Sequence, residues 1–149
     1  MTTHATTPNH ESAPKQKLIT DLEISIDPRS PESMFIDLNR FQVFDGDDPT
    51  VTLVCGATDD EKIGIVVWNL EPGQENERHM HPAIDHVHVV LTGEAEYHLA
   101  SGPALTVRAG QAVMVPAGVM HGIRNVRNER CSYLAVTSPG NYEKVLETR

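Results

Sequence analysis

Histidine is concentrated in one part of the chain, where six of the eight histidines fall between positions 79 and 121. Residues two apart on a β-strand point to the same face, so His79 and His81 are expected to project together. His86 and His88 should do the same from the next strand, and His121 follows a later turn. Neutral imidazole is a ligand for several transition metals. The spacing therefore predicts one bound divalent metal ion, with Fe, Mn, Ni, Cu or Zn as candidates.

Short β-like segments surround these histidines. Turn residues containing Gly or Pro recur between them, and such spacing is typical of an all-β sandwich or barrel. The predicted strands are 22–26, 34–37, 41–44, 50–55, 63–70, 86–91, 94–100, 104–108, 111–116 and 131–138. The only helical signal is a turn or two within 142–149. Residues 1–17 are polar and are predicted to form a flexible arm, with a single β-barrel domain over 18–149.

Two gapped motifs in the histidine-rich region resemble those of the cupins. Residues 73–93 read GQENERHMHPAIDHVHVVLTG, which matches G-x5-H-x-H-x3,4-E-x6-G except that His86 stands at the Glu position. Residues 110–125 read GQAVMVPAGVMHGIRN, which matches G-x5-P-x-G-x2-H-x3-N in full. The resemblance implies a double-stranded β-helix, or jelly-roll, barrel. It also implies pairing of two chains through N-terminal strands, which would make the protein a homodimer.

The resemblance also assigns candidate metal ligands. His79, His81 and His121 match three cupin ligands, and His86 takes the fourth position, which is normally a carboxylate. The alternative is Asp85 as the fourth ligand, which would need a slipped register or a bulge. Asn125 is expected to form hydrogen bonds rather than to bind metal.

The barrel wall offers two further candidates for chemistry. The acidic side chains of Glu94 and Glu96 mark the solvent face of their strand, so Tyr97 should point inward and His98 outward. Tyr97 could then line the cavity or only pack in the core, as we expect of Trp68. His88 should share the cavity of His86, but about 7 Å further along the strand, too far to share one ion easily. It could exchange protons with a substrate, or only orient a ligand.

These features support three classes of function. A metal with two free coordination positions suits substrates that chelate through two oxygens, so the first hypothesis is a dioxygenase acting on a small carbonyl or enol compound. The second is a non-redox cyclase, isomerase or lyase. The third is a non-catalytic small-molecule binding or sensing protein, although no DNA-binding segment accompanies the barrel.

Charge and the remaining residues narrow the partners. The net charge of −9 disfavours nucleic acid and membrane surfaces as partners. The N-terminus lacks the pattern of a secretory signal, so a cytoplasmic protein is expected. Cys55 and Cys131 lie in apolar segments and are expected to be free thiols, unless their strands adjoin and allow them to pair.

Overall fold

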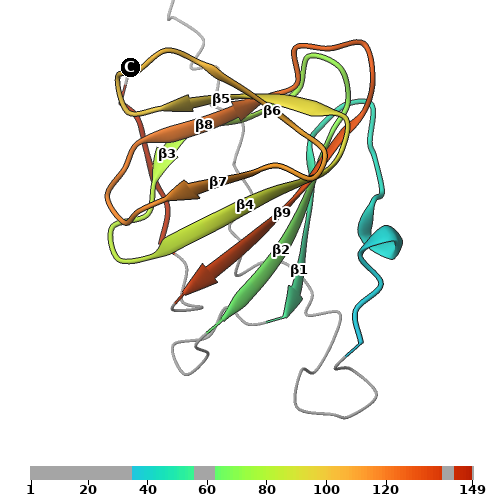
Figure 1. Cartoon of the computed structure of the whole chain (residues 1–149), viewed down its shortest axis with the longest axis horizontal. Coiled ribbons are helices and arrows are strands. Elements are labelled where there is room, and N and C mark those ends of the chain that lie inside the picture. The colour runs from blue at the N-terminus through green and yellow to red at the C-terminus, as the bar shows by residue number, and fades with distance from the viewer. Residues whose placement is uncertain (1–34, 56–62, 139–142, 149) are drawn as a thin grey trace, which may run out of the picture.

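The computed structural model describes residues 35–55, 63–138 and 143–148, and this part of the chain is almost entirely β-structure. One sheet has the spatial order β1 (Thr50–Cys55), β2 (Gly64–Leu70), β9 (Cys131–Ser138), β4 (Asp85–Thr92) and β7 (Ala112–Val115). The other has the order β10 (Val145–Leu146), β3 (Glu75–Met80), β8 (His121–Arg124), β5 (Glu94–Leu99) and β6 (Leu105–Arg108). Figure 1 shows the two sheets as facing layers. The predicted all-β barrel is confirmed.

Alternation along the strands explains which side chains line the interior. On β7, Val113 and Val115 are buried whereas Met114 is 63% exposed, which assigns the inward face that the sequence left open. On β5, Tyr97 is fully buried and the His98 side chain is 40% exposed, as predicted. Trp68 belongs to the core and stacks on Tyr133, with 6.3 Å between ring centroids. The interior is therefore lined by the inward residues of both sheets.

Three predicted elements are wrong. Residues 35–37 and 42–44 form no strand, and a short 3-10 helix, η3 (Leu38–Phe41), lies between them. The side chain of Asp37 accepts a hydrogen bond from the backbone N–H of Asn39 at 3.1 Å, a local bond that competes with strand pairing. At the other end, β10 replaces the predicted helical turn, because Val145 and Leu146 pair with Met80 and His79 of β3.

The two cysteines do not form a disulfide, because Cys131 is a buried free thiol. In the ladders on either side of β2, Cys55 lies opposite Ile65 and Cys131 opposite Leu70. Five residues of strand separate these positions by roughly 16 Å, well beyond the reach of a disulfide. Burial raises the pKa of the Cys131 thiol to about 12, so it stays protonated.

Several predictions fall outside the part of the chain that the structure describes. The flexible arm at 1–17 and the strand at 22–26 lie there, and so does much of the N-terminal region expected to pair two chains. No helix among the described residues is long and apolar enough to cross a membrane.

Candidate metal centre

Five histidines from the two sheets gather in the barrel interior, and each is at most 3% exposed: His79, His81, His86, His88 and His121. His79 on β3 and His121 on β8 are direct partners across the antiparallel ladder, and their ring centroids are 4.3 Å apart. Residues that face each other in this way share one side of the sheet. The ladder between β3 and β8 therefore fixes the first pair of imidazoles.

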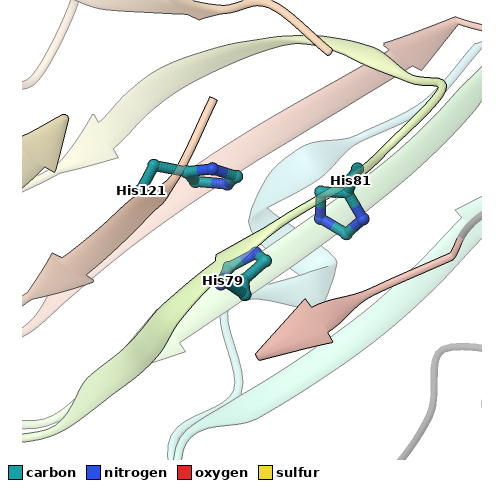
Figure 2. A group of neighbouring side chains, drawn as sticks. All are labelled: His79, His81 and His121. Carbon is teal, nitrogen blue, oxygen red and sulfur yellow. The ribbon is translucent and has the colours of Figure 1, made fainter. Parts of the chain in front are cut away.

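His81 follows the end of β3, and a tight turn that contains Gly118 holds it beside this pair. The backbone N–H of Gly118 donates to the carbonyl oxygen of His81 at 2.9 Å, and Gly118 has a φ of +76°, which favours glycine. The His81 ring lies 4.9 Å from that of His79 and 5.8 Å from that of His121. Figure 2 shows the three imidazoles around a common space.

The central strand β4 of the other sheet supplies two more imidazoles. The ring of His86 lies 4.4 Å from that of His81 and 5.3 Å from that of His121. The ring of His88 lies 5.4 Å from that of His86 and 5.6 Å from that of His121. The five histidines predicted from the sequence are thus brought together, with His121 in contact with the other four rings.

The ligand atoms fall into two overlapping groups, within each of which all atoms lie within 4.8 Å of one another. The outer group is His79, His81 and His121, and the inner group is His86, His88 and His121. The prediction that His88 lies too far from His86 to share one ion was based only on the backbone spacing along the strand. In the structure the His86 and His88 rings stack at 21°, which brings their nitrogens closer than that spacing suggests.

Backbone carbonyl oxygens orient the outer group. The Nδ1 atom of His79 lies 2.5 Å from the carbonyl oxygen of Glu77. The Nδ1 atom of His81 lies 2.5 Å from the carbonyl oxygen of Glu143, and that of His121 lies 2.9 Å from the carbonyl oxygen of Val119. A carbonyl oxygen can only accept, so each Nδ1 carries the proton and each Nε2 keeps its lone pair. Acceptors of this kind usually fix metal-binding histidines. The Nε2 atom of His121 is buried and has no hydrogen-bond partner among the described residues.

Burial keeps all five imidazoles neutral. Loss of solvation is the main cause of the lowered pKa in each, and it brings the pKa to about 3 for His81 and about 4 for His86. Full burial also lowers the pKa of His88 well below its usual 6.5. Neutral imidazoles offer the nitrogen lone pairs that a transition metal needs.

The structure separates His86 from the alternative ligand beside it. Asp85 is exposed, and its Oδ1 accepts a hydrogen bond from the backbone N–H of Ala117 at 2.9 Å, while His86 points into the barrel. Asn125 donates to the carbonyl oxygens of Leu70 and Glu129, as expected for a hydrogen-bonding residue. Asp85 and Asn125 thus hold turns and loops beside the cluster.

Tyr97 also approaches the cluster, with its ring centroid 5.8 Å from that of His88. Its hydroxyl is buried and has no hydrogen-bond partner among the described residues. Burial raises the pKa of Tyr97 above its usual value of 10, so the phenol stays protonated. It is available as a hydrogen-bond donor to a group bound in the interior.

Lys144 is a residue of the site that the sequence analysis missed. Its segment was expected to form a helical turn, but it runs beside β3, and Lys144 Nζ donates to Asn76 Oδ1 at 3.0 Å. The ammonium charge contributes to the lowered pKa of His79, His81 and His121. The only signal in the sequence was a basic residue next to the apolar pair Val145 and Leu146.

A separate surface cleft of about 510 Å³ shares no residue with the histidine cluster. Its wall includes Glu94, which pairs with both Arg108 and Arg127. Glu94 and Glu129 together balance the charges of Arg108 and Arg127, so the lining of this exposed cleft carries no net charge.

Comparisons with known proteins agree with this architecture. Residues 66–137 match the family described as "Cupin domain". An uncharacterised Klebsiella pneumoniae protein with a double-stranded β-helix domain is 28% identical, with a TM-score of 0.71, over 78% of this chain and 99% of that one. TT1209 from Thermus thermophilus is also 28% identical, with a TM-score of 0.63, over 70% and 96%. The DMSP lyase DddQ from Ruegeria pomeroyi shares the fold at 21% identity and a TM-score of 0.60, over 67% and 52%. No curated protein matches the sequence.

Proposed function

Because residues 66–137 form a cupin domain around the histidine cluster, we propose that this chain is a metal-dependent dioxygenase for a small chelating carbonyl or enol substrate. The observation that carries the proposal is the outer group of buried histidines. Three imidazoles converge there, and each has its Nδ1 against a backbone carbonyl oxygen, so that its Nε2 carries the lone pair. The donor set fits one divalent transition metal.

His86 is proposed as the fourth ligand, because its ring lies against those of His81 and His121. Four imidazoles carry no charge, so the ion would keep its full 2+ charge toward substrate oxygens. An ion held by these four imidazoles would still have coordination positions open to substrate oxygens. When bound, the metal would supply Lewis acidity and, if redox-active, activation of O₂.

The remaining residues of the cavity would act on the substrate. The Tyr97 hydroxyl would donate a hydrogen bond to a substrate oxygen, since it has no partner among the described residues. His88 is neutral and buried beside Tyr97, and we propose that it takes up or gives back a substrate proton. Its low pKa means that a proton would stay on it only while negative charge lies close by. The apolar core around them keeps bulk water away.

Oxygen consumption distinguishes this function from its alternatives. The protein is loaded separately with Fe(II), Mn(II), Ni(II), Cu(II) or Zn(II) and given a panel of 1,3-dicarbonyl and ene-diol compounds under air and under anaerobic conditions. We expect turnover that consumes O₂ with at least one redox-active ion and none with Zn(II). Anaerobic turnover with Zn(II) would instead support a cyclase, isomerase or lyase. Tight ligand binding without turnover would support a binding or sensing protein.

A further inference from the structure

Lys144 carries a positive charge in a half-buried position without an ion pair. Its Nζ donates to Asn76 Oδ1 at 3.0 Å and lies 5.6 Å from the centroid of the Trp68 ring. Within residues 35–55, 63–138 and 143–148, no carboxylate oxygen lies within 4.0 Å of this ammonium. Burial lowers the pKa of this ammonium and the negative charge of Glu77 offsets only part of that effect, so the partial burial of the charge is costly. The fold therefore keeps a cation where stability alone would not favour one.

This ammonium belongs to the segment that touches the metal centre. The preceding residue, Glu143, offers its carbonyl oxygen to His81, and the following residue, Val145, pairs with Met80 of β3. Its positive charge contributes to the lowered pKa of the three histidines of the outer group. Lys144 therefore lies beside the histidine cluster, on the side where β10 joins β3.

Asn76 fixes the position of the ammonium. It is only 3% exposed, and its Nδ2 donates to the Tyr133 hydroxyl at 3.0 Å, so its Oδ1 is turned toward Lys144. An ammonium group has three N–H donors, and this bond uses one of them. The other two have no hydrogen-bond partner in the part of the chain that the structure describes and are available to a group that enters beside the histidines.

The charges at the site indicate which kind of molecule should bind beside the histidines. A divalent ion held by neutral imidazoles would, together with the Lys144 ammonium, place three positive charges at this site, and none of the candidate ligands is a carboxylate. Such a site attracts negatively charged molecules and repels positively charged ones.

We propose that Lys144 is the anion-recognising residue of the site, binding a carboxylate or enolate oxygen of a substrate whose other oxygens chelate the metal. This proposal rests on the proposed metal enzyme and defines its substrate class. The substrate is a small anion with a carboxylate one or two carbons from a second oxygen donor, as in 2-oxo or 3-oxo acids. Lys144 positions this anion and leaves the metal ligands unchanged.

Binding of two probes to the Co(II)-loaded full-length protein tests this role. Malonate is a chelating dianion, and imidazole is a neutral ligand for the same ion, so the visible absorption of Co(II) reports both. Lys144→Met should weaken malonate binding at least about tenfold, the usual effect of losing a hydrogen bond between charged groups. Its metal content and its affinity for imidazole should stay at the wild-type level, and Lys144→Arg should restore part of the malonate affinity.

Arg124→Met is the matched control, because it removes the same charge from an exposed position on β8 and should leave malonate binding unchanged. Wild-type malonate affinity in Lys144→Met would overturn the proposal. An equal loss of malonate and imidazole affinity, or loss of metal, would overturn it too, since Lys144 would then only support the ligands. A wild-type chain that binds no Co(II) would refute the metal enzyme itself, and metal analysis shows this before any probe is added.

Discussion

The Nδ1 atom of His81 lies 2.5 Å from the carbonyl oxygen of Glu143, which comes 62 residues later in the chain. The candidate metal centre is therefore completed by a backbone group outside both histidine motifs. A side-chain substitution at Glu143 cannot remove this acceptor. It is kept in place by the pairing of β10 with β3.

A chain ending at residue 142 should therefore keep its histidines but bind metal more weakly. Loss of the acceptor for His81 is expected to lower metal affinity about 10–100-fold. Competition with a coloured chelator measures the change, and Glu143→Ala, which keeps the carbonyl, serves as control. Equal affinity of the shortened and full-length chains would show that this bond does not support the site.

His121→Ala should abolish stoichiometric metal binding. His121 is the one histidine that belongs to both groups of candidate ligands, so its loss leaves neither group complete. Elemental analysis of protein purified without added metal gives the answer, with His98→Ala as a control because the half-exposed His98 side chain on β5 lies outside the cluster. Full metal content in His121→Ala would contradict a histidine-bound centre.

His86→Glu should still bind metal, but with a lower redox potential. The carboxylate adds a negative charge that stabilises the more oxidised ion. Voltammetry of the Fe-loaded variant measures the shift. Asp85→Ala should keep its metal, because Asp85 bonds the turn at Ala117. Metal loss in Asp85→Ala together with retention in His86→Ala would reverse the two roles.

His88→Phe should bind metal normally and lose turnover. Phe keeps the bulk of the ring but removes the nitrogen, so a proton-exchange role predicts a fall of about a hundredfold or more. Unchanged turnover would make His88 a structural residue. The Co(II) spectrum gives separate information, because it should change only if His88 contacts the ion.

Lys144 should make stability depend on pH in the alkaline range. Burial lowers the pKa of Lys144 from 10.5 to about 8 in the folded protein. Between pH 8 and 10.5 the unfolded chain therefore binds more protons at this residue, and the free energy of unfolding should rise with pH. Urea unfolding of the metal-free proteins should show that the free energy of unfolding of the wild type rises relative to that of Lys144→Met across this pH range. A constant difference between them would mean that the ammonium is well solvated.

The sequence predicted the barrel because strand alternation and turn residues are local signals. The strands at 50–55 and 131–138 have the predicted bounds. The segment at 35–44 departs from the prediction, because Asp37 and Asn39 bond each other while Phe35 and Val43 stay exposed. Apolar residues alone do not make a strand where no neighbouring strand covers them.

The five histidines could be found from their spacing, since residues two apart share a face and His121 completes a recognisable motif. Lys144 and the carbonyl oxygen of Glu143 could not be found in this way. Their positions depend on the pairing of β10 with β3, which joins segments far apart in the chain. The lowered pKa of His88 was missed as well, because it follows from full burial rather than from residue type.

The two ring nitrogens of His121 have different roles, which limits the number of metal ions that the two histidine groups can bind. Nδ1 lies 2.9 Å from the carbonyl oxygen of Val119, so only Nε2 is left for a metal. Because both groups need this single atom, they cannot each hold an ion at the same time, and together they bind one ion at most. An ion that moved inward could exchange His79 and His81 for His88 while staying bonded to His86 and His121.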